Sequence, residues 1–239
     1  MTRILPLATC LALGIVGANA RGEAFDNDID KLCPAASREQ DELLSTRRTL
    51  KEVKVVTRPA LRIELLDMAR RDQEARATMI RDTRQPLSQE DEDSAWVPVQ
   101  KVDEDNLRQL KHIVAQDGFP TTTMVGVDGV RAAFLLTQHA DSDPLFQENI
   151  LRVVKRRFPT GEVSGDAFAL LTDRVLTAKG LAQRYGTQFE KRDGDFKPKP
   201  TADAAHVNER RHVLGLISLE NYSCVIRAVY GVANPSSSR

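Results

Sequence analysis

One histidine of this chain stands where acid–base chemistry is plausible. His139 lies in the run Gln138-His139-Ala140-Asp141, directly after a long apolar segment. The pKa of a histidine is close to neutral, so its ring can take up and release protons at physiological pH. Asp141 or Asp72 could orient the ring or act as a second carboxyl group, and Tyr185 could donate a hydrogen bond to a developing negative charge. The residues therefore allow a hydrolase or lyase with His139, Asp141 and Tyr185 as catalytic residues.

A binding role competes with this interpretation. Polar side chains interrupt the apolar faces of several expected helices, and burying them costs free energy unless they find partners. Such side chains either hold a polar or anionic ligand or join helices internally without any ligand. The chain has no nucleophile elbow, phosphate loop or metalloprotease motif. We therefore favour a binding or structural module with a polar cleft for a small polar or anionic ligand, with the hydrolase or lyase as the alternative. The candidate ligand-binding residues are Asp72, Gln73, Arg76, Gln138, Asp173, Arg174, Gln183, Thr187, Gln188 and Arg211.

Two geometric expectations follow from these candidates. Asp72 and Arg76 are four residues apart, so they should form an ion pair across one helical turn. If the polar residues form one site, at least four members of a central set should converge in one cavity. That set is His139, Asp141, Arg174, Tyr185 and Gln188.

No metal or cofactor is expected. His139, Asp141 and Asp143 could offer ligands from one turn, but Asp143 precedes Pro144 and is better explained as a helix cap. The acidic run at residues 90–93 lacks the alternating ligands and the glycine of a calcium loop.

The first twenty residues have the pattern of a secretory signal peptide. Arg3 precedes an apolar run at residues 5–18, and Ala18-Asn19-Ala20 offers a cleavage site. Cleavage would remove Cys10 and leave Cys33 and Cys224, which either form a disulfide or remain separate thiols. We therefore expect export to the periplasm or the medium, with no stable membrane insertion after cleavage.

The charge balance argues against one class of partner. The chain has 34 basic and 34 acidic residues and a formal net charge of zero, whereas nucleic-acid binding rests on a basic surface. We expect no nucleic acid, and a small polar ligand or an extracytoplasmic protein as the partner.

The periodicity of apolar residues predicts an all-α fold, a single compact helical bundle of six or seven helices. After the signal peptide at 1–20, residues 21–58 are expected to form an N-terminal arm, 59–232 the helical domain and 233–239 a flexible tail. Within the domain, Pro86, Pro98 and the acidic run predict a solvated loop over 82–102, followed by a helix from Asp103. Residues 194–200 are expected to form a second loop, and Asp143, Ser164 and Ser218 to begin helices.

Several ordered blocks resemble one bacterial family catalogued as a domain of unknown function. The first is Asp72-Gln73-x-x-Arg76, and two others are the Q-H-A-D signature at 138–141 and the Y-G-T-Q signature at 185–188. Further blocks lie at 171–175 and at Arg210-Arg211, so the resemblance covers about residues 60–222. Phe119 stands where the family has a tryptophan in a G-W-P turn. The resemblance implies a shared fold and candidate residues, and it implies no activity.

Overall fold

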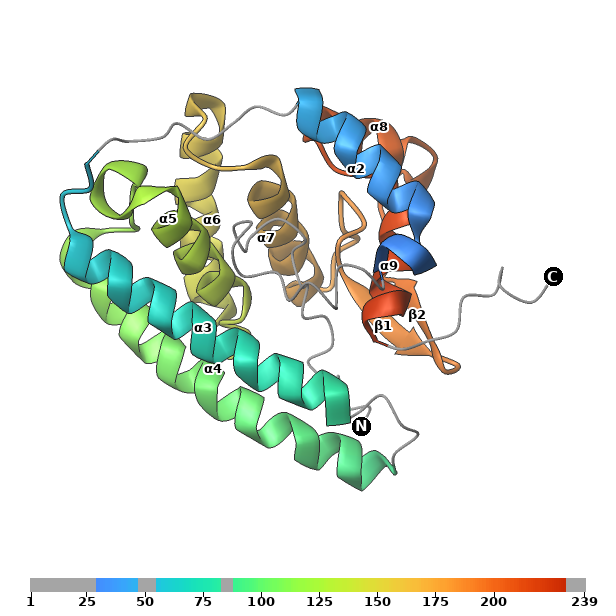
Figure 1. Cartoon of the computed structure of the whole chain (residues 1–239), viewed down its shortest axis with the longest axis horizontal. Coiled ribbons are helices and arrows are strands. Elements are labelled where there is room, and N and C mark those ends of the chain that lie inside the picture. Colours follow the sequence, from blue (N-terminus) through green and yellow to red (C-terminus); the bar gives the residue numbers. More distant parts are fainter. Residues whose placement is uncertain (1–28, 47–54, 83–87, 231–239) are drawn as a thin grey trace. The chain divides into compact units, whose positions relative to one another are not determined.

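The computed structural model describes residues 29–46, 55–82 and 88–230, which are mostly helical with one two-stranded sheet (Figure 1). The chain divides into two compact units. The middle unit is Leu50–Val163, and the terminal unit joins Met1–Thr49 to Ser164–Arg239. The expected signal peptide and the expected tail lie outside the described residues.

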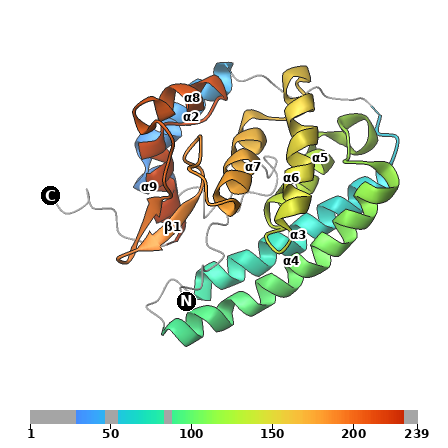
Figure 2. The ribbon, with the colours of Figure 1, turned by 180° about the vertical axis from the view of Figure 1, so that it is seen from behind.

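The middle unit contains the helices α3 (Pro59–Asp82), α4 (Gln89–Asp117), α5 (Thr122–Gln138) and α6 (Pro144–Arg157), followed by the short 3₁₀-helix Phe158–Thr160. Helix α3 packs against both α4 and α5, and α5 also contacts α4 (Figures 1 and 2). The contacts bury an apolar stripe of α3 that includes Leu61, Leu65, Met68 and Met79. Amphipathic helices associate in this way because burying apolar surface is favourable.

Helix α4 corrects the prediction of a solvated loop over residues 82–102. The helix begins at Gln89, where the Ser88 hydroxyl accepts a hydrogen bond from the main-chain nitrogen of Asp91. It continues through Pro98, although a proline inside a helix costs about 3 kcal/mol. Trp96 and Val99 are buried on either side of Pro98, and acidic residues favour the start of a helix. Packing and capping thus outweigh the proline.

The start of α6 follows the prediction, and α5 ends shortly before it. Helix α5 ends at Gln138 with His139 as its C-cap. Asp143 is the N-cap of α6: its side chain accepts a hydrogen bond of 2.9 Å from the main-chain nitrogen of Phe146, and Pro144 is the first helical residue. The tight turn between the two helices fixes the main chain around His139.

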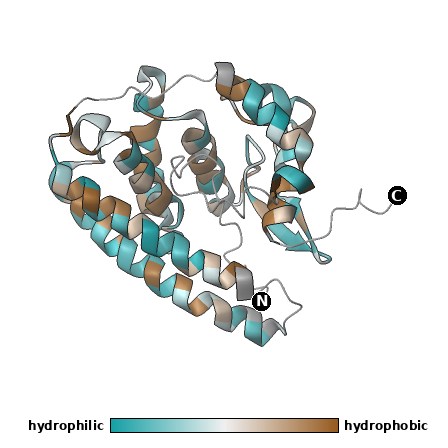
Figure 3. Cartoon of the chain, viewed as in Figure 1, coloured by the Kyte–Doolittle hydropathy of each residue, from teal (hydrophilic) through white to brown (hydrophobic). Residues whose placement is uncertain are grey.

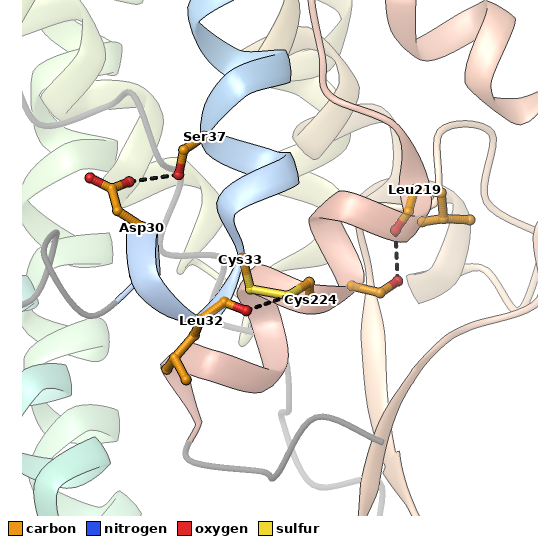
Figure 4. The surroundings of a disulfide bond; sticks show 7 residues. Asp30, Leu32, Cys33, Ser37, Leu219 and Cys224 are labelled. Carbon is orange, nitrogen blue, oxygen red and sulfur yellow. Dashed lines mark hydrogen bonds between the residues drawn. A yellow bond between two sulfur atoms is a disulfide. The ribbon is translucent and has the colours of Figure 1, made fainter. Parts of the chain in front are cut away.

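The terminal unit contains α2 (Pro34–Thr46), α7 (Gly165–Ala178), β1 (Phe189–Arg192), β2 (Asp195–Pro198), the 3₁₀-helix Ala204–His206, α8 (Val207–Val213) and α9 (Leu219–Val229). Helix α2 comes from the segment expected to be an arm, and it packs against α9. A disulfide between Cys33 and Cys224 joins the two, and a hydrogen bond from Ser37 to Asp30 lies close by (Figure 4).

The strands β1 and β2 are a second correction, because the sequence predicted no strand and a loop over 194–200. They form an antiparallel hairpin in which Phe189 pairs with Pro198. Asp193 and Gly194 turn the chain with φ values of 55° and 78°, as a two-residue Asp-Gly hairpin turn requires. Phe189 and Phe196 are buried. The fold is therefore mostly helical, as predicted, but it is neither purely α nor a single bundle of six or seven helices.

No helix of the described residues combines the length and the apolar character needed to cross a membrane.

Candidate functional site

A buried carboxylate lies in the apolar stripe of α3. Asp72 follows Met68 at a spacing of four residues and has no exposed surface, and Arg76, one turn further, is 3% exposed. Polar residues therefore replace apolar ones in part of the stripe, and Figure 3 shows hydrophilic and hydrophobic residues mixed along α3 and α4. Charged groups so deeply buried must find partners.

Asp72 finds three partners. The Nδ1 atom of His139 lies 2.8 Å from Oδ1 and 2.9 Å from Oδ2 of Asp72. Arg76 Nη1 donates to Oδ1 at 2.9 Å, and Gln73 Nε2 donates to Oδ2 at 2.8 Å. Because Asp72 engages Nδ1, a proton that moves between His139 and any other group has to pass through Nε2.

A second carboxylate is linked to the first through Arg76. Arg76 Nη2 lies 2.8 Å from both carboxylate oxygens of Asp103 on α4. Asp72, Arg76 and Asp103 thus form a chain of charge-assisted hydrogen bonds in which one guanidinium bridges two carboxylates. The ion pair predicted between Asp72 and Arg76 is confirmed.

The two carboxyl groups differ in acidity. Burial by itself raises the pKa of Asp72. The charge of His139 and its hydrogen bond to Asp72 act in the opposite direction, and Arg76 and Gln73 add to their effect. Together they lower the pKa of Asp72 below its ordinary value. Burial also raises the pKa of Asp103, to about 7, since the charges of Asp72 and Asp141 add to the effect and Arg76 offsets it only in part. Pairs of groups whose pKa values are pushed apart are common where protons are transferred.

Asp72, Asp103 and His139 are also of the types that bind metal ions, and one ligand atom of each lies within 4.8 Å of the others. However, Arg76 already contacts both carboxylates. A divalent cation would meet the positive charge of Arg76 at a few ångströms, where repulsion between like charges is strong. The arrangement therefore suits proton transfer better than a resident cation.

The residues following His139 hold this turn in place. Gln147 Nε2 donates to the carbonyl oxygens of Thr137 and Gln138 and to Asp141 Oδ1, at 3.1 to 3.2 Å. Asp141 is exposed, and the carboxylate that contacts the His139 ring is Asp72. Of the two aspartates that the sequence offered to orient the ring, the structure uses Asp72.

Asp103 and Gln147 were not among the candidate residues. The sequence predicts Asp103 only as the first residue of a helix, because Pro98 and the acidic run before it favour a loop. The sequence does contain a signal for Asp103, namely the spacing of Val99, Asp103, Leu110 and Ile113. This spacing places Asp103 in the buried stripe of α4 once the helix is extended toward its N-terminus.

The candidates of the terminal unit form a different kind of cluster. Asp173 of α7 has no exposed surface, and it accepts hydrogen bonds of 2.7 to 3.1 Å from the main-chain nitrogens of Arg184, Tyr185 and Thr187. The Thr187 hydroxyl adds a bond of 2.9 Å. Burial raises the pKa of Asp173 despite these hydrogen bonds. Asp173 thereby fixes the loop of the Y-G-T-Q signature.

Two glutamines close the same loop. Gln183 Oε1 accepts a hydrogen bond of 2.8 Å from the main-chain nitrogen of Gln188, and Gln183 Nε2 donates to the carbonyl oxygens of Gln188 and Lys199. Gln188 Nε2 donates to the Thr187 hydroxyl at 3.2 Å. These amides bond within the loop and to the end of the hairpin.

Arg211 performs a similar task from α8. Its Nε and Nη1 atoms donate to the carbonyl oxygens of Ile217 and Tyr185, both at 2.6 Å, and its guanidinium lies 4.9 Å from the ring centre of Tyr222. Arg174, also a candidate, is buried in α7. The contacts described for Asp173, Gln183 and Arg211 support the main chain of this unit.

The candidate residues therefore fall into two groups. Asp72, Gln73, Arg76, Gln138, His139 and Asp141 belong to the middle unit, and Asp173, Arg174, Gln183, Tyr185, Thr187, Gln188 and Arg211 to the terminal unit. The convergence of four central residues in one cavity stays a prediction, because its members come from both units.

The comparisons with known proteins identify a family. No curated protein and no solved structure matches the chain. One family model matches residues 59–234, and its description is "Family of unknown function (DUF6624)". The match confirms the resemblance to an uncharacterised family. The chain therefore belongs to DUF6624, a family of unknown function.

Proposed function

We propose that the middle unit binds a small polar ligand beside His139 and acts on it by general acid–base catalysis, as a hydrolase or lyase does. The observation that carries this proposal is the contact of 2.8 and 2.9 Å between His139 Nδ1 and the buried Asp72 carboxylate. A carboxylate in this place holds the ring in one tautomer and stabilises the imidazolium that forms when Nε2 takes up a proton.

The surrounding groups support proton transfer. Nε2 of His139 takes a proton from water or from the ligand, and Asp103 is a second group that titrates near neutrality, with a pKa of about 7. Arg76 joins Asp103 to Asp72, so a change of charge at one carboxyl group is felt at the other.

Turnover of a panel of uncharged chromogenic esters, amides and glycosides tests the proposal. His139→Gln should lower kcat by about 10² to 10⁴ for any substrate that the wild-type protein turns over, the usual contribution of a general acid–base group. His112→Gln is the matched control, since His112 is exposed on α4, and it should leave kcat unchanged. Equal activity of His139→Gln and wild type would refute the catalytic role.

A binding module without catalysis is the second candidate. It is favoured by one observation: the side-chain amide of Gln138 is buried, and neither of its polar atoms has a hydrogen-bond partner among the described residues. A ligand that raises the Tm of wild type and His139→Gln equally, without turnover of the panel, would support this candidate over the enzyme.

We also propose that the chain is exported. Two features support it: the signal-peptide pattern of residues 1–20 and the Cys33–Cys224 disulfide, since disulfides persist mainly in oxidising compartments. The mass of the protein recovered from a periplasmic fraction or the medium should correspond to a chain that begins at Arg21. Full-length protein found only in the cytoplasm would contradict export.

A further inference from the structure

Gln138 stands out among the buried glutamines of the described residues. The others, Gln147, Gln183 and Gln188, use their side-chain amides in hydrogen bonds of 2.8 to 3.2 Å. Gln138 is 2% exposed, yet within the described residues its Oε1 and its Nε2 have no partner. An amide taken out of water without a partner costs several kcal/mol. The position is thus unfavourable for the free protein and suited to a group that brings its own hydrogen bonds.

Two neighbouring helices also carry buried polar atoms that lack a hydrogen-bond partner among the described residues. Asn106 on α4 is 3% exposed, and its Nδ2 has no partner among the described residues; the same is true of Arg76 Nε on α3. Asn106 lies three residues after Asp103, so the two share one face of α4. Since α3 contacts both α4 and α5, the unsatisfied atoms belong to the three packed helices that also carry the Asp72–His139 pair.

The chemistry of these groups narrows the ligand. A glutamine amide offers one acceptor oxygen and two donor hydrogens side by side. A carboxylate or phosphate has no hydrogen to donate, so it would satisfy only the NH₂ group and would be repelled by Oε1. A primary amide, in contrast, carries an N–H donor beside its carbonyl oxygen and can satisfy both atoms of Gln138. In a trans secondary amide the N–H and C=O groups point in opposite directions, so it cannot pair with both atoms.

We propose that Gln138 recognises the amide group of an uncharged ligand, with Asn106 as a further donor. The inference deepens the proposed function and rests on it, because it names the chemical class of the ligand that His139 acts upon. It replaces the wider expectation of a polar or anionic ligand by a neutral one that carries a primary amide.

Acetamide and methyl acetate are the probes for this proposal, since methyl acetate lacks the N–H donors of acetamide. Titration of the ¹⁵N-labelled mature protein should shift the side-chain NH₂ signals of Gln138 with acetamide, and methyl acetate should bind about tenfold more weakly. Gln138→Met should abolish the difference between the two probes. Equal binding of both probes, or no shift with acetamide, would overturn the proposal.

Stability provides an independent readout, with Gln147→Met as the matched control. Gln147 makes hydrogen bonds within the fold, so its replacement should lower the Tm by roughly 2 to 4 °C for each bond lost. Gln138→Met removes an amide that has no partner, so its Tm should equal or exceed that of wild type. A Tm for Gln138→Met as low as that of Gln147→Met would show that Gln138 is an internal hydrogen-bonding residue and would refute the proposal.

The proposed function and this inference fail separately. If acetamide binds through Gln138 but His139→Gln retains full turnover, the catalytic proposal falls and the amide site stands. If His139→Gln loses turnover but neither probe discriminates wild type from Gln138→Met, the amide site falls alone.

Discussion

At the scale of residues, Asp72 is the side chain on which the buried polar contacts of the middle unit depend most. Its carboxylate has no exposed surface and contacts His139, Arg76 and Gln73 at 2.8 to 2.9 Å. The loss of the carboxylate would remove the acceptor that Asp72 offers to Nδ1 of His139 and one of the two carboxylates that contact Arg76. Breaking one side of a buried ion pair is much more destabilising than replacing the whole pair.

Asp72→Ala should therefore lower the free energy of unfolding by about 3 to 5 kcal/mol, measured by urea denaturation. Asp67→Ala is the control, because Asp67 lies on the same helix and pairs with Arg70 at an exposed site, where such pairs contribute about 1 kcal/mol or less. If the two variants unfold at the same urea concentration, the buried pair contributes no more to the free energy of unfolding than the exposed pair does.

Asp103 predicts a particular dependence of stability on pH. Its pKa of about 7 in the folded protein lies above the ordinary value of 3.8, so the folded state binds a proton more tightly than the unfolded state does. The stability that this group contributes is thus fully present below about pH 4 and is lost as the pH rises to about 7. The lowered pKa of Asp72 acts in the opposite direction, but only below the ordinary value of 3.8.

Asp103→Asn should remove the contribution of Asp103 to this dependence of stability on pH. The difference in unfolding free energy between about pH 5 and about pH 8 should be smaller in Asp103→Asn than in wild type. Urea denaturation at both pH values measures it, and Asp105→Asn, a partly exposed position on the same helix, serves as the control. An unchanged difference would mean that Asp103 does not titrate in this window.

At the scale of elements, α2 is attached to the terminal unit by side chains as well as by the disulfide. Glu39 accepts hydrogen bonds from the main-chain nitrogen and hydroxyl of Ser218, the N-cap of α9, and from Asn221 and His212, at 2.6 to 2.9 Å. Burial raises the pKa of Glu39, but the hydrogen bonds outweigh it and lower the pKa. A carboxylate at a helix N-terminus is favourable because the main-chain N–H groups there need acceptors.

The disulfide should stabilise the terminal unit strongly. Cys33 and Cys224 are 191 residues apart, and linking distant residues restricts the unfolded chain most, for a typical gain of about 2 to 5 kcal/mol. Reduction should therefore shift the urea midpoint of the wild type downward. The double variant Cys33→Ser, Cys224→Ser should start at that lower midpoint and be insensitive to reductant. A urea midpoint of the wild type that is the same with and without reductant would contradict this prediction.

The helices and strands also show where the periodicity of apolar residues led to wrong predictions. The helix starts at Asp143 and Ser164 were predicted correctly because they depend on a few adjacent residues. Helix α4 was truncated in the prediction, since Pro98 and the acidic run are local signals for a loop, whereas the burial of Trp96 and Val99 is a tertiary effect. The hairpin was missed because its strands have only four residues each.

At the scale of the whole molecule, the two ends of the chain belong to one compact unit and its middle to the other. The family match begins at residue 59, where α3 begins, and it runs through both units to residue 234. Helix α2 and Cys33 therefore precede the family region, and the disulfide ties them to Cys224 inside it.

Residue type and spacing alone predict the helical character, the family, the Asp72–Arg76 pair and the identity of most of the polar residues that are buried among the described residues. These depend on spacing and residue type within a few turns. The packing of the helices, in contrast, settles which carboxylate contacts His139 and that Arg76 bridges Asp72 to Asp103. These contacts join residues 67 and 27 positions apart. Packing also leaves the Gln138 amide without a partner among the described residues. None of these outcomes is encoded in local periodicity.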